Sequence, residues 1–142
     1  MPGRHRPVSL TGKAAVYAAA LRRAARAAVL NVGVDAVRQA FAGRALSVSI
    51  LWTFPTDHPE RLGHPHTFRP DKDNCEKLVL DCLQRAGALG GDDSRVALGL
   101  TQKIWGVQGT VAIRVEVVTR ADVREVRKSI KNKLSAPPSW LG

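Results

Sequence analysis

The sequence predicts a single α+β domain in which helices pack a small mixed sheet with a C-terminal β-hairpin. The predicted elements run helix, strand, helix, strand, strand, helix, an order typical of the α+β class. The 142 residues suffice for one hydrophobic core but are few for two. We therefore expect residues 1–142 to form one domain, with a basic arm at residues 1–10 and a tail at residues 135–142.

The first half of the chain predicts a long helix and a strand. Residues 11–31 are rich in alanine, the residue with the highest helix propensity. Their apolar face is predicted at Val16, Ala20, Ala24 and Ala27. A short second helix is expected at residues 34–41. Residues 46–54 are rich in β-branched and aromatic side chains, which favour a strand with Trp52 in the core.

A long polar connection follows this strand, over residues 55–70. Loops of this length in compact domains are usually functional or mobile. It contains His58, His64 and His66. Without a cysteine nearby, we expect these histidines to make hydrogen bonds or phosphate contacts rather than to bind a transition metal.

The second half predicts a helix at residues 71–86, two strands at residues 95–104 and 110–118, and a last helix at residues 121–134. Gly106 and Gly109 lie between the two strands and predict the turn of a hairpin. Cys75 and Cys82 are seven residues apart, which is beyond disulfide reach on one helix. We expect both to be reduced and buried, as in a cytoplasmic protein.

Charge is distributed unevenly in this basic chain, whose net charge is +10. Residues 1–44 hold eight basic and one acidic residue, residues 45–93 five and eight, and residues 94–142 nine and three. A basic surface attracts polyanions such as nucleic acid. Acidic residues within it repel phosphate unless a metal ion inverts the local sign of charge. No segment approaches the roughly 20 apolar residues of a membrane span.

The acidic residues gather around one predicted helix. Asp71 and Asp73 lie at its start, Asp92 and Asp93 follow the glycines after it, and Lys77 lies one turn beyond Asp73. Carboxylates are typical ligands of Mg²⁺, and a lysine beside them can hold a phosphate. A purely structural interpretation stays open, in which Asp73 and Glu76 form a capping box and the Asp92–Asp93 pair serves a turn.

A resemblance to a known family bears on this choice. The run RPDKDNCEKLVLDCLQRAG, followed by GDDSRV, resembles the signature of the RusA family of Holliday junction resolvases. The shared features are Asp-x-Asp-Asn, a lysine four residues after the second aspartate, a Leu-Asp-x-Leu segment and a later Asp-Asp pair. The resemblance covers roughly residues 46–118. The start of the chain, MPGRHRPVSLTG, lacks the family's usual first strand and Pro-Pro loop.

The resemblance implies a metal-dependent endodeoxyribonuclease that cuts four-way DNA junctions by paired symmetric incisions. It implies a homodimer that uses Mg²⁺, with Mn²⁺ as a substitute, and no small-molecule cofactor. Asp71, Asp73 and Asp93 would be catalytic metal ligands, and Lys77 the catalytic lysine. Phosphate contacts are expected from Arg69, Lys72 and Lys103.

Two other hypotheses fit the composition. One is a non-catalytic basic protein that binds or shapes DNA, and the other is a regulatory protein with an acidic partner. Only the enzyme would cleave branched DNA in the presence of a metal, which distinguishes it from the non-catalytic DNA-binding protein. Only a DNA-binding protein would retain affinity for DNA at about 0.1 M salt, which distinguishes the enzyme from the regulatory protein.

Overall fold

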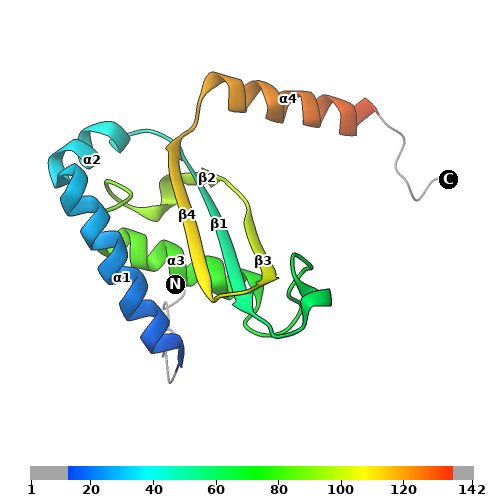
Figure 1. Cartoon of the computed structure of the whole chain (residues 1–142). Helices are drawn as coiled ribbons and strands as arrows, with labels where there is room; N and C mark the ends of the chain where they lie inside the picture. The colour runs from blue at the N-terminus through cyan, green and yellow to red at the C-terminus, as the bar shows by residue number, and fades with distance from the viewer. Residues whose placement is uncertain (1–12, 136–142) are drawn as a thin grey trace, which may run out of the picture.

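The computed structural model describes residues 13–135, so the predicted arm at residues 1–10 and the tail after residue 135 lie outside the described residues. Within them, the α+β class is confirmed (Figure 1). The helices are α1 (Lys13–Val32), α2 (Val34–Phe41), α3 (Lys72–Arg85) and α4 (Arg120–Ser135). The strands are β1 (Leu46–Pro55), β2 (Val96–Leu98), β3 (Thr101–Gly106) and β4 (Thr110–Val117). Two short 3-10 helices, η1 (Pro59–Arg61) and η2 (Asp93–Arg95), complete the order.

The sheet is built around β1. This strand runs parallel to β2 and β3 on one edge and antiparallel to β4 on the other. The two predicted C-terminal strands, β3 and β4, follow each other through the turn at residues 107–109. They do not pair with each other as a hairpin would, because each pairs with β1. The backbone polar groups of β1, the central strand, therefore have hydrogen-bond partners on both edges.

The strand predicted at residues 95–104 is divided into β2 and β3 by a glycine. Gly99 has a φ of 125°, and a Cβ atom there would lie 1.9 Å from the Val48 carbonyl oxygen. Only glycine allows this conformation and this close approach. Beyond the break, the Ile50 amide donates to the Leu100 carbonyl (2.9 Å), and β3 resumes the parallel pairing.

The core lies on one face of the sheet. Side chains alternate along β1, so that Leu46, Val48, Ile50 and Trp52 are buried, as predicted for Trp52. They pack against α3. Figure 1 shows α1 and α3 on the same side of the strands. Both cysteines are free and buried, as predicted, and the Cys82 thiol lies 3.7 Å from the Ala18 carbonyl oxygen of α1.

The predicted apolar face of α1 was wrong. Ala20, Ala24 and Ala27 are exposed, and the buried positions are Ala18 and Val29, with Leu21 and Ala25 packed against the core. The side chain of Val16 is outside the described set. Leucine and valine bury more apolar area than alanine, so they decide which face turns inward when alanine occurs all around a helix.

The last helix, α4, extends away from the sheet (Figure 1). Its apolar residues Val123, Val126 and Ile130 are 42, 40 and 50% exposed. Among the described residues, no helix is both long enough and apolar enough to cross a membrane.

Candidate functional site

Two exposed carboxylates mark the start of α3. Asp71 is the N-cap residue of the helix, yet its side chain makes no capping hydrogen bond, and Asp73 follows in the first turn. Within the described residues, no hydrogen bond or ion pair holds either carboxylate. The predicted capping box is absent, because Glu76 instead accepts a hydrogen bond from the Thr101 hydroxyl (2.9 Å). Both aspartates therefore remain available to a ligand.

Positive charges flank this acidic pair. Lys77 lies one turn beyond Asp73, and the two border a shallow hollow with Glu76 and Leu80. Lys103 approaches from β3, where its Nζ donates to the Phe68 carbonyl (2.7 Å). Arg69 and Lys72, the other predicted phosphate contacts, are exposed next to Asp71 in the chain. Their contact with DNA stays a prediction.

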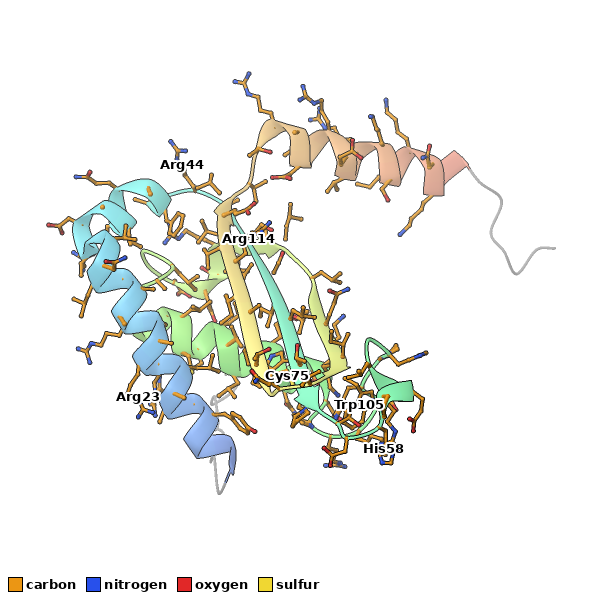
Figure 2. All side chains as sticks on the ribbon, viewed as in Figure 1. Arg23, Arg44, His58, Cys75, Trp105 and Arg114 are labelled. Atoms are coloured by element: carbon orange, nitrogen blue, oxygen red, sulfur yellow. The ribbon has the colours of Figure 1, made fainter. Side chains whose placement is uncertain are left out.

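Cys75, labelled in Figure 2, is buried in the first part of α3, and the pKa of its thiol responds to the charges around the start of this helix. Burial raises the pKa of this thiol, the positive charge of Lys103 opposes the rise, and the negative charges of Asp71 and Asp73 add to it. Lys103 and the two aspartates thus all act on one buried atom. The hydrogen bond from Lys103 to the Phe68 carbonyl likewise brings this lysine near the residues that precede α3, although it lies about thirty residues away in the chain.

The third predicted ligand lies elsewhere. The Asp93 amide donates to Gln84 Oε1 (3.3 Å), in the last turn of α3. Gln84 follows Asp73 by eleven residues, which corresponds to about 16 Å along the helix axis. Arg95 holds η2 at this end, because its guanidinium donates to the carbonyls of Leu89 (2.8 Å) and Phe41. Among the described residues, no group of three or more His, Cys, Asp or Glu side chains is placed to hold one metal ion.

The predicted convergence of Asp93 with Asp71 and Asp73 is therefore absent within one chain. The strand after η2 does run back along α3, but it brings Thr101 to Glu76 and Lys103 to Phe68, near the start of the helix, and leaves Asp93 at the other end. Asp92 caps η2 by accepting a hydrogen bond from the Ser94 amide (3.0 Å). The hydrogen bond from Ser94 is the main cause that lowers the pKa of Asp92, and a hydrogen bond with Asp93 is the second. Asp92 therefore has a structural role in the turn.

The long connection before α3 packs against the open edge of β3. The His66 amide donates to the Lys103 carbonyl (2.9 Å), and the Trp105 amide donates to the His64 carbonyl (3.0 Å). The His66 ring is buried and stacks on Phe54 with centroids 3.8 Å apart. The exposed His58 pairs with Glu60 (3.3 Å). The three histidines thus have separate surroundings and form no shared metal site.

The comparison with known families decides the kinship of the chain. The family model described as Endodeoxyribonuclease RusA matches residues 1–116. The chain belongs to the RusA family. The match includes both ends of α3 and nearly all of the sheet, whereas α4 lies beyond it. Searches of curated proteins and of solved structures found no match. RusA membership supports endonuclease activity and action on branched DNA junctions.

Proposed function

We propose that this RusA-family protein is a Mg²⁺-dependent, structure-selective endodeoxyribonuclease that resolves four-way DNA junctions by paired symmetric incisions. The observation that carries the proposal is the Asp71–Asp73 pair, two exposed carboxylates that no cap or ion pair holds within the described residues. The family match supports the substrate class. A role in DNA recombination and repair would place the protein in the cytoplasm.

The acidic pair suits a hard cation. Mg²⁺ is often bound by one or two carboxylates, with water and substrate phosphate completing its coordination, so Asp71 and Asp73 would hold it at the start of α3. When bound, the ion would supply positive charge at the scissile phosphate and activate a water molecule. Mn²⁺ accepts the same oxygen ligands and is expected to substitute.

The lysines at this site would act on the DNA itself. Lys77 borders the same hollow as Asp73, so its ammonium group would stabilise the charge that develops on the phosphate during cleavage. Lys103, Arg69 and Lys72 would position the DNA backbone through phosphate contacts, which fix orientation without reading sequence. Through these contacts the site would recognise the shape of the DNA backbone rather than the base sequence.

Asp93 can serve the same cation only from a second copy of the chain. Within one chain it lies by the last turn of α3, whereas Asp71 and Asp73 lie at the first. A homodimer in which α3 of one copy meets η2 of the other would complete the set of three acids twice. Two such sites related by a twofold axis would produce the paired symmetric incisions.

Cleavage of a labelled four-way junction tests the enzymatic proposal. Wild-type protein is expected to cut the junction with Mg²⁺ or Mn²⁺ and to leave it intact in excess chelator. Asp71→Asn and Asp73→Asn should each reduce cleavage about 100-fold or more, the usual loss when a group that stabilises transition-state charge is removed, while junction binding is retained. A wild-type protein that binds branched DNA but never cuts it with either metal would instead be a non-catalytic DNA-binding protein.

A mixed dimer tests whether the acids are shared between copies. The heterodimer contains one Asp73→Asn chain and one Asp93→Asn chain. If each site takes Asp73 from one chain and Asp93 from the other, one site contains both changes and the other site contains neither. This dimer should nick one strand of the junction, whereas both homodimers should be inactive. If each site lay within one chain, both sites of the mixed dimer would be damaged and no nick would form.

A further inference from the structure

A cluster of aromatic rings stands beside the acidic pair, where β1 and β3 end. The His66 ring lies 3.8 Å from Phe54 and 4.4 Å from Trp105, measured between centroids. Phe68 meets two of these rings edge to face, at 6.0 Å from His66 and 5.9 Å from Trp105. The inner rings are packed into the protein, so Phe68 is the outermost member.

Phe68 is 61% exposed despite these contacts. Its backbone is held in place, because its carbonyl accepts a hydrogen bond from Lys103 Nζ (2.7 Å). A large apolar side chain fixed in this way, with most of its surface in water, gains little from packing. Much of the ring is thus left for a partner outside the chain.

The surroundings indicate the chemistry of that partner. Phe68 lies three residues before Asp71, so the two Cα atoms are within about 11 Å of each other. The Arg61 guanidinium lies over the Trp105 ring, 5.4 Å from its centroid. Together with Lys103, it adds positive charge to the rim of the cluster. Aromatic rings among basic residues are typical of sites that stack unpaired bases while holding the strand backbone.

We propose that Phe68, supported by His66 and Trp105, stacks on an unpaired nucleobase at the branch point of the bound DNA. The inference rests on the proposed function, because it concerns the DNA whose backbone lies over Asp71 and Asp73. Stacking would favour DNA in which bases have left the helix, which is a property of opened branch points rather than of intact duplex. It would thereby link recognition of the junction to the position of the scissile phosphate.

Three substitutions separate stacking from packing. Phe68→Ala removes the ring, Phe68→Leu keeps an apolar side chain without an aromatic face, and Phe68→Trp keeps the face. The matched control is Leu62→Ala, because Leu62 lies in the same connection and is 43% exposed. Thermal unfolding of each protein checks its fold, and Phe68→Leu keeps the test valid if the alanine variant does not fold.

Junction affinity is then measured in chelator with an intact junction and with plain duplex. It is also measured with four junctions that each lack one twofold-related pair of the eight bases at the branch point. On the intact junction, Phe68→Ala and Phe68→Leu should weaken binding about fivefold or more, while Phe68→Trp and Leu62→Ala should not. On one of the four abasic junctions, the difference in affinity between wild type and Phe68→Leu should disappear, because both bases that the two Phe68 rings of the dimer contact are missing.

Equal loss on all five junctions, or no loss on the intact one, would overturn the inference. Loss of the same size on plain duplex would also overturn it, since duplex offers no unpaired base. These outcomes leave the proposed function unaffected, because metal-dependent cleavage by the wild-type protein is measured separately. Failure of cleavage in turn leaves the stacking measurement interpretable as a property of DNA binding.

Discussion

His66 anchors the long connection at residues 55–70 to the sheet. Its ring is buried against Phe54 of β1, a position that favours the neutral form. Its side chain is 7% exposed and packed on Phe54. Burial lowers the pKa of His66 below 6.5, and the nearby positive charge of Lys103 lowers it further. Proton binding to this ring is therefore opposed in the folded protein, so acid should weaken the end of the molecule that carries Asp71.

The sign of this effect gives a prediction for His66. Because its pKa is lower in the folded state, the unfolded chain binds the proton first, and stability falls as the pH drops below about 6.5. In wild type, the melting temperature should decrease between pH 7.5 and pH 5.5. His66→Phe keeps a ring and removes the proton site, so its decrease should be smaller. The exposed His58→Phe is the control, and an unchanged slope in the His66 variant would contradict the assignment.

Among the elements, the broken strand formed by β2 and β3 depends on one residue. Gly99 combines a positive φ with a close approach to the Val48 carbonyl. Gly99→Ala should cost about 3 kcal/mol or more of unfolding free energy, because the backbone of β1 or of β2 has to move. Gly63→Ala is the matched control, since Gly63 also has a positive φ, of 80°, but has open space around it.

The control should cost only about 1–2 kcal/mol, the usual penalty for a left-handed residue with a side chain. Urea unfolding of the three proteins measures both values. Equal losses at Gly99 and Gly63 would show that the conformation alone matters and that the contact with Val48 does not.

At the scale of the elements, the sequence predicted individual helices and strands better than it predicted how distant segments pair. The strand predicted at residues 46–54 and the helix predicted at residues 71–86 were confirmed, because neighbouring residues in the sequence favour these structures locally. The pairing of both C-terminal strands with β1, and the approach of Lys103 to the start of α3, are contacts between distant segments. Such contacts have no period, so the hairpin pairing and the convergence of Asp93 were not predicted correctly from spacing alone.

At the scale of the whole molecule, the two ends of the sheet carry different functional groups. Val96, just after η2, and Val117, just before α4, both pair with Leu46. Asp93 and the start of α4 therefore lie at one end, and Asp71 and Asp73 at the other. If Asp93 of one copy serves the acidic pair of its partner, α4 accompanies it toward the DNA held there.

This arrangement predicts that α4 contributes to the grip on DNA. Arg120, Arg124 and Arg127 are spaced to lie on one face of the helix and are exposed. Replacing the three with glutamine should make the dependence of log K on log salt concentration less steep by about 2–3 for each copy that engages DNA, since each phosphate contact contributes about 0.9. Junction binding across a series of salt concentrations measures this slope.

The matched control changes the same amount of charge on another helix. Arg22, Arg23 and Arg26 are exposed on α1, so replacing them with glutamine alters the net charge equally. If α4 makes direct phosphate contacts, its variant should lower the slope by more than the α1 variant does. Equal slopes would mean that the net charge of the molecule sets the affinity, because long-range attraction does not depend on which helix carries the charge. The helix beyond the family match would then have no specific part in holding the junction.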